Sequence, residues 1–152
     1  MIREQIKEKL IAAMKAKDEK TTGTLRLINA AIKDKDIDVR AKGVTDGIDD
    51  AGVMSLLQSM IKQRRESIDM YTKGGRADLA AGEQAEIDLI QSFLPQQMSE
   101  DEIRTVLEGI IAETGATSIK DMGKVMGVLK TKYAGRLDMG KASSLIKTVL
   151  GQ

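Results

Sequence analysis

The stretch LPQQMSEDEI, residues 94–103, contains the only proline of the chain and divides the sequence into two parts. Pro95 disfavours helical backbone at the residue before it, so a helix is expected to end there. Ser99 and Glu102 then have the S-x-x-E spacing of a capping box, which typically opens a new helix. The sequence therefore predicts a boundary between two helical domains at this point.

Apolar residues recur at helical spacing on both sides of this boundary. Four such segments precede the proline and three follow it, and none of the chain shows the clean alternation of a strand. We therefore predict an all-α protein, with a four-helix N-terminal domain over residues 1–95 and a three-helix C-terminal domain over residues 96–152. The third helix is expected to begin near Asp49 or Asp50 and to end at Gly74-Gly75.

The second helix has less distinct ends. Thr21 or Thr22 is expected to cap it, because threonine is a common N-cap residue. The polar stretch 33–50 loses helical periodicity, so the helix should end within it and a loop should begin. Three aspartates in this stretch alternate with basic residues and are interpreted as solvated rather than as a metal site: Asp34, Asp36 and Asp38.

The composition excludes several kinds of chemistry. The chain has no cysteine and no histidine, which removes disulfides, thiolate metal sites, cysteine nucleophiles and the usual proton shuttle at neutral pH. No phosphate loop, serine elbow or zinc-protease motif occurs, so we expect no catalytic residue, no metal, no cofactor and no independent enzyme. Catalysis by lysine or carboxylate side chains, which needs no compact sequence motif, is the remaining alternative. No apolar segment is long enough for a membrane span and the N-terminus lacks a signal peptide, which predicts a cytoplasmic protein.

Charge is distributed unevenly along the chain. Residues 1–94 are balanced, with 16 basic and 16 acidic residues. Residues 99–116 carry one basic and five acidic residues, whereas residues 117–152 carry seven basic and two acidic ones. A local basic cluster of this kind attracts phosphate backbones, with an affinity that falls as salt rises. An ordinary solvated face is the alternative.

Two groups of residues are predicted to contact nucleic acid. The first lies in the C-terminal basic segment and the second on the long third helix. The first group is Lys120, Gly123, Lys124, Lys130, Lys132, Arg136 and Lys141, and the second is Lys62, Arg64 and Arg65. The second group has a structural alternative, because two of its members are spaced for ion pairs with acids one helical turn further on.

Gly123 and Gly127 form a G-x-x-x-G pattern within a predicted helix. We expect the pattern to allow close packing of two helices. The alternative is that Gly123 brings backbone N–H groups close to a phosphate. Asp138 is expected to cap the last helix.

Four segments resemble YqeY-like proteins of the GatB/YqeY family, in order and over nearly the full length. They are LRLINAAIK (25–33), MIKQRRESIDMYTKGGRADLA (60–80), EIDLIQSFLPQQMSEDEI (86–103) and DMGKVMGVLKTKYAGRLD (121–138). The resemblance implies four helices followed by three. The C-terminal part is similar to the tail domain of the B subunit of the glutamine-dependent tRNA amidotransferase, at Gly123, Val125, Met126, Gly135, Arg136 and Asp138.

The amidotransferase tail approaches the body of tRNA, and its catalytic part has no counterpart in this chain. The resemblance therefore implies a non-catalytic helical module that binds tRNA or another structured RNA, or a tRNA–protein complex, in tRNA-dependent amidation or translation. An alternative is a protein-interaction accessory of an amidotransferase or an aminoacyl-tRNA synthetase. A third hypothesis is the carbon–nitrogen ligase activity of the whole amidotransferase, with glutamine as amido-N-donor.

Overall fold

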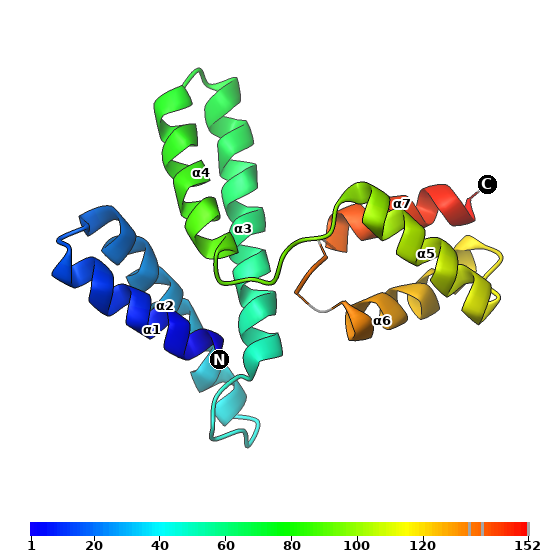
Figure 1. The fold of residues 1–152 in the computed structure, drawn as a ribbon, viewed down its shortest axis with the longest axis horizontal. Helices are drawn as coiled ribbons and strands as arrows, with labels where there is room; N and C mark the ends of the chain where they lie inside the picture. Colours follow the sequence, from blue (N-terminus) through cyan, green and yellow to red (C-terminus); the bar gives the residue numbers. More distant parts are fainter. Residues whose placement is uncertain (134, 138, 152) are drawn as a thin grey trace. The chain divides into compact units, whose positions relative to one another are not determined.

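The computed structural model describes residues 1–133, 135–137 and 139–151. Over these residues the secondary structure is entirely helical and includes no strand, which confirms the predicted all-α class (Figure 1). Asp138, the expected cap of the last helix, lies outside the described residues.

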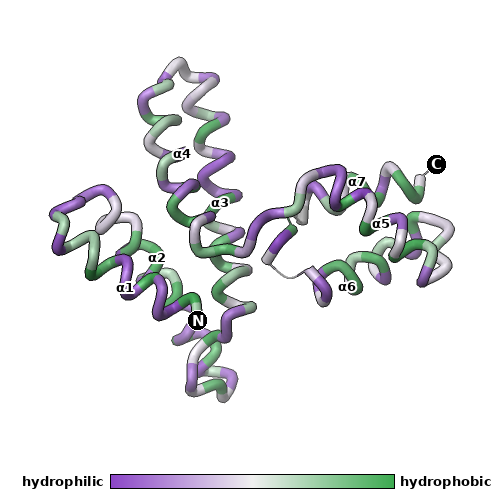
Figure 2. Tube along the Cα trace, in the orientation of Figure 1, coloured by the Kyte–Doolittle hydropathy of each residue, from purple (hydrophilic) through white to green (hydrophobic). Residues whose placement is uncertain are grey.

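The chain forms two compact units, Met1–Leu94 and Pro95–Gln152, which we call the N-terminal unit and the C-terminal unit. Each unit has a hydrophobic core of its own. Along the helices, hydrophobic residues alternate with hydrophilic ones, so each helix turns an apolar stripe to its core and a polar face to solvent (Figure 2).

The N-terminal unit consists of two helical hairpins, in which α1 lies beside α2 and α3 lies beside α4 (Figure 1). Its helices are α1 (Ile2–Lys15), α2 (Glu19–Arg40), α3 (Asp50–Lys73) and α4 (Ala77–Gln91). Side chains from all four helices meet in the core, among them Ile6, Leu25, Leu57 and Ile90, none of which is exposed. The two hairpins diverge away from this core, which leaves an open angle between α2 and the α3/α4 pair.

The caps of α2 and α3 are both aspartates. Asp18 caps α2 by accepting a hydrogen bond from the backbone N–H of Thr21 at 3.1 Å, so the prediction of a threonine cap is wrong. The hydroxyl of Thr21 instead donates to Asp18, and this bond lowers the pKa of the aspartate. Asp49 caps α3 and Gly74 ends it, as predicted.

Helix α2 ends at Arg40, within the polar stretch 33–50 as predicted, and a loop then leads to α3. Asp34 and Asp38 are exposed, but Asp36 is paired rather than freely solvated, which corrects the prediction for this residue. It accepts a hydrogen bond from Arg3 at 2.8 Å and another from the backbone N–H of Ile48 at 2.9 Å. These bonds, the Arg3 bond first, lower the pKa of Asp36 to about 2. Arg3 also donates to the carbonyl of Ile48, so the pair ties α1, α2 and the loop before α3 together.

The C-terminal unit contains three α-helices and one short 3-10 helix. They are α5 (Glu100–Thr114), η1 (Ile119–Asp121), α6 (Met122–Lys132) and α7 (Met139–Leu150). Ser99 caps α5 by accepting from the backbone N–H of Glu102 at 3.2 Å, as predicted. Gly115 ends α5 in the left-handed conformation at φ +69°, which glycine adopts without strain. The core of this unit is built from α5, α6 and α7.

Candidate nucleic-acid interface

The outward face of α6, together with Lys120 of η1, is formed by lysines, glycines and a threonine. Val125 and Leu129 turn inward and are completely buried. On the opposite side of the helix, Lys124, Gly127 and Thr131 are exposed. The exposed set on this face, which we call the α6 face, is Lys120, Gly123, Lys124, Gly127, Lys130 and Thr131.

Gly123 and Gly127 lie in the open part of the α6 face. Apart from the adjacent residues and the nearby backbone of α6 itself, a Cβ atom built on either glycine would meet no atom within 4 Å. The prediction that this G-x-x-x-G pattern packs two helices of the chain together is therefore wrong. The physical reason is orientation, because the pattern falls on the face of α6 opposite to Val125 and Leu129. The glycines instead leave the helix backbone uncovered between the lysines.

The carboxylate of Asp121 lies at the start of α6 but turns back toward the preceding turn. It accepts from the backbone N–H of Thr117 at 3.0 Å and from that of Ser118 at 3.3 Å. These bonds lower the pKa of Asp121, and the charge of Lys124 acts in the same direction. The aspartate therefore stays ionised, and its hydrogen-bonding capacity is partly taken up by backbone.

Lys132 and Arg136 reach acidic residues of α5. Lys132 Nζ lies 3.7 Å from Glu113 Oε2, and both side chains are more than half exposed. Arg136 lies 4.0 Å from Glu102 and donates from Nε to the carbonyl of Gln96 at 3.1 Å. Sequence reasoning missed both acidic partners. The signal was present, because the acidic segment directly precedes the basic one.

Arg136 also belongs to a network that holds the segment before α5 against the turn after α6. The backbone N–H of Met98 donates to the carbonyl of Arg136 at 2.9 Å, and the side chain of Gln97 donates to the carbonyl of Gly135 at 2.6 Å. Arg136 thus has a structural role, because its backbone and its side chain both hold parts of the C-terminal unit together. Lys141 is exposed on α7 and has interactions within the chain.

The second predicted group lies on α3, in the N-terminal unit. Arg64 donates from Nε to Glu86 of α4 at 2.8 Å and from Nη1 to the carbonyl of Met60 at 3.1 Å, and its side chain is only 13% exposed. This arginine therefore joins α3 to α4, and we leave it out of the interface proposed below. Lys62 and Arg65 are exposed.

The structure thus brings together Lys120, Gly123, Lys124 and Lys130, and gives Lys132 and Arg136 acidic neighbours. No group of three acidic side chains close enough to hold a metal ion occurs in the described part of the chain. Among the described helices, none is long and apolar enough to cross a membrane.

A family model described as Yqey-like protein matches residues 3–150 of the chain. The chain belongs to the YqeY-like family. This confirms the resemblance to YqeY-like proteins, while the similarity to the amidotransferase tail stays a prediction.

Curated relatives of this YqeY-like chain include the protein named "Altered inheritance of mitochondria protein 41, mitochondrial" in several yeasts. The protein from Eremothecium gossypii is 40% identical over 89 residues, which cover 59% of this chain and 46% of the relative. The one from Lachancea thermotolerans is 34% identical over 110 residues, covering 71% and 57%. The one from Saccharomyces cerevisiae strain YJM789 is 28% identical over 133 residues, covering 84% and 69%. The chain therefore spans about half the length of the first two relatives.

The names of these relatives contradict the cytoplasmic prediction, because they describe mitochondrial proteins. That prediction was based on the lack of a membrane span and of a secretory signal peptide. A mitochondrial protein needs neither feature, so their absence does not distinguish the two compartments.

Proposed function

We propose that this YqeY-like chain is a non-catalytic helical module that binds the phosphates of tRNA, or of a tRNA–protein complex, through the α6 face. The observation that supports this best is the exposure of Lys120, Lys124 and Lys130 around two uncovered glycines. Lysine ammonium groups neutralise phosphates, and the release of condensed counterions then drives binding.

The uncovered glycines add a reason to expect close approach. Without a Cβ at positions 123 and 127, a phosphate or ribose can reach the surface of the helix itself between the lysine side chains. Thr131 cannot donate freely there, because its hydroxyl donates to the carbonyl of Gly127 at 2.9 Å. Charge from lysine, rather than a hydroxyl, is thus the main feature of the α6 face.

The chemistry of the α6 face supports binding rather than catalysis. The chain supplies no histidine or cysteine. The nearest carboxylate, Asp121, is kept ionised by backbone N–H groups, which makes it a poor proton donor at neutral pH. If the chain had the carbon–nitrogen ligase activity of the whole amidotransferase, the purified protein would form amide on mischarged tRNA with ATP and an ammonia source. We expect no product.

The test is the affinity for unmodified tRNA across a salt series, measured by fluorescence anisotropy. The slope of log affinity against log salt is negative. Replacing Lys120, Lys124 and Lys130 with alanine should make it shallower by about 2 to 3, since each phosphate contact contributes ~0.7 to 0.9 to its magnitude. The matched control replaces three exposed lysines of the N-terminal unit with alanine: Lys15, Lys33 and Lys35. An equal loss of slope in both triple variants would refute the proposal.

A second candidate function is a protein-interaction accessory of an amidotransferase or an aminoacyl-tRNA synthetase. Large apolar side chains that stay exposed in the N-terminal unit favour it, such as Leu27 at 54% and Met70 at 73%. Capture of a synthetase or amidotransferase subunit that survives nuclease treatment and the triple lysine substitution would support this function. Capture that nuclease abolishes would favour RNA binding instead.

A further inference from the structure

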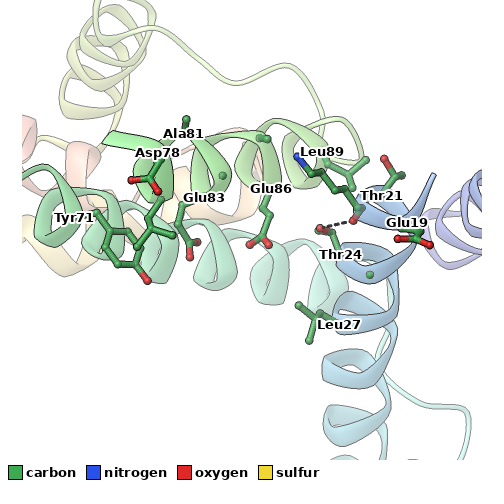
Figure 3. A pocket seen from close by; sticks show the side chains of 15 residues that line it. Glu19, Thr21, Thr24, Leu27, Tyr71, Asp78, Ala81, Glu83, Glu86 and Leu89 are labelled. Carbon is green, nitrogen blue, oxygen red and sulfur yellow. Dashed lines mark hydrogen bonds between the residues drawn. The ribbon is translucent and has the colours of Figure 1, made fainter. Parts of the chain in front are cut away.

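A groove of about 770 Å³ lies in the angle between α2 and the α3/α4 hairpin. Leu27 projects into it from α2, and Tyr71, Glu83 and Glu86 project into it from the hairpin (Figure 3). All of its lining residues belong to the N-terminal unit. The groove is therefore separate from the α6 face and goes beyond the proposed RNA-binding function.

The apolar residues of the groove are incompletely covered. Leu27 of α2 is 54% exposed and Leu79 of α4 is 38% exposed, while Leu89 and Tyr71 are half-buried. Among the residues of α4, only Ile87 and Ile90 are buried. A helix that is apolar on more than one side normally buries more than one side, so α4 has apolar surface left for a second contact.

The polar lining of the groove is predominantly acidic, with four carboxylates and one lysine: Glu19, Asp78, Glu83, Glu86 and Lys20. Glu86 is paired with Arg64 at 2.8 Å, and Asp78 with Arg76 at 3.1 Å. In the described part of the chain, Glu19 and Glu83 form no ion pair. The groove thus combines exposed leucines with two carboxylates, Glu19 and Glu83, that have no basic partner among the described residues.

We propose that this groove binds a basic amphipathic helix of a partner protein. The apolar stripe of that helix would cover Leu27, Leu79 and Leu89, and its lysine or arginine side chains would meet Glu19 and Glu83. An exposed apolar groove that receives the apolar face of a helix is a recurring mode of peptide recognition. Here the acidic lining selects a basic helix over an acidic one.

The dimensions of the groove fit a helix of about three turns. The lining residues of α4 extend from Asp78 to Leu89, a length of ~16 Å at 1.5 Å per residue. A helix of about 11 residues has this length, so it could lie along α4 over the whole lining.

The groove can be filled without harming the fold at Gly82. This glycine lies within α4, and a Cβ atom on it would meet no atom within 4 Å. Gly82→Leu should therefore fold and should occupy the groove with its own side chain. Gly109→Leu is the matched control, because Gly109 is equally open within α5 of the C-terminal unit.

The probe is a synthetic helix of about 15 residues with leucines at helical spacing, lysines at most other positions and one tryptophan. Since the chain has no tryptophan, peptide fluorescence anisotropy reports binding alone. The control peptide has glutamate in place of every lysine. We expect the lysine peptide to bind wild type and Gly109→Leu equally, and both Gly82→Leu and the glutamate peptide to weaken binding at least ~10-fold.

Binding of the lysine peptide that is unchanged by Gly82→Leu would overturn the proposal, and so would equal binding of the two peptides. A wild-type dimer in sedimentation that Gly82→Leu converts to a monomer would assign the groove to a second copy and would also overturn it. The triple alanine variant at Lys120, Lys124 and Lys130 should bind the peptide normally. The two proposals can therefore fail independently.

Discussion

Replacement of Arg64 by alanine should distinguish a structural arginine from the lysines that we propose to bind RNA. Arg64 joins α3 to α4 through Glu86 at 2.8 Å and through the carbonyl of Met60 at 3.1 Å. Lys130, in contrast, is exposed on α6. Both residues are basic and lie on helices, so sequence alone gives them the same candidate role. The structure predicts opposite consequences for Arg64→Ala and Lys130→Ala.

The expected cost of Arg64→Ala follows from the burial of the pair. A hydrogen bond to a charged group contributes about 1.5–3 kcal/mol to stability. The Arg64 side chain is 13% exposed, whereas that of Glu86 is 32% exposed and can partly rehydrate after the substitution. We therefore expect the free energy of unfolding to fall by about 2 kcal/mol, including the lost packing of the aliphatic part of the arginine. Lys130→Ala should change it by less than about 0.5 kcal/mol.

The assay is urea unfolding followed by tyrosine fluorescence. The chain has two tyrosines, Tyr71 in the N-terminal unit and Tyr133 in the C-terminal unit. A Tyr133→Phe background therefore reports on the N-terminal unit alone. A loss of 2 kcal/mol should lower the urea midpoint by about 1–2 M, given a denaturant slope of about 1–2 kcal/mol per molar.

Anisotropy with tRNA completes the comparison. Lys130→Ala should weaken binding about 3- to 10-fold at moderate salt, and Arg64→Ala should leave it unchanged within about twofold. The reasoning would be refuted if Arg64→Ala kept the wild-type urea midpoint. Loss of tRNA affinity in a folded Arg64→Ala protein would refute it equally.

Three further substitutions test the fold. Asp36→Asn should cost about 1–2 kcal/mol at pH 7, less than the pKa of about 2 alone implies because the pair with Arg3 is partly exposed. Since the folded pKa lies below the unfolded one, that difference should be complete above about pH 5 and shrink as pH falls toward 2, as measured by denaturation at each pH. Gly47→Ala should destabilise by about 1–3 kcal/mol in the same assay, because φ is +83° and the new Cβ would lie 2.6 Å from Asp36 Oδ1. Gly82→Ala should instead stabilise by about 0.5–1 kcal/mol, seen as a higher urea midpoint, because its Cβ has open space within α4.

Local signals in the sequence predicted the starts of α3 and α5 correctly, whereas the cap of α2 was assigned to a threonine instead of Asp18. Asp49 and Ser99 cap helices by bonding backbone N–H groups three residues further on, a contact that depends only on nearby sequence. Gly74 ends α3 as predicted, again through a residue type that favours helix termination locally. The family resemblance was also readable, because its motifs extend over most of the chain.

Contacts between distant residues were not readable in the same way. The sequence around Asp36 shows only its basic neighbours and not its partner Arg3, which lies 33 positions earlier. Glu86 lies 22 positions after Arg64. The sequence of the basic cluster on α3 therefore does not show that Arg64 forms an ion pair with α4. The spacing of Gly123 and Gly127 shows that they share one face of α6. It does not show whether another helix covers that face, which is why the packing prediction is wrong. The groove depends on the angle between two hairpins, which no local pattern encodes.

Lysine footprinting with and without tRNA tests the central claim most directly. Acetylation of the native protein by a water-soluble reagent, followed by mass spectrometry, gives the reactivity of each exposed lysine. We predict that tRNA protects Lys120, Lys124 and Lys130, while Lys15 and Lys33 of the N-terminal unit react as they do in the free protein. Protection spread evenly over all five lysines, or confined to the N-terminal unit, would contradict the assignment of the RNA interface to α6.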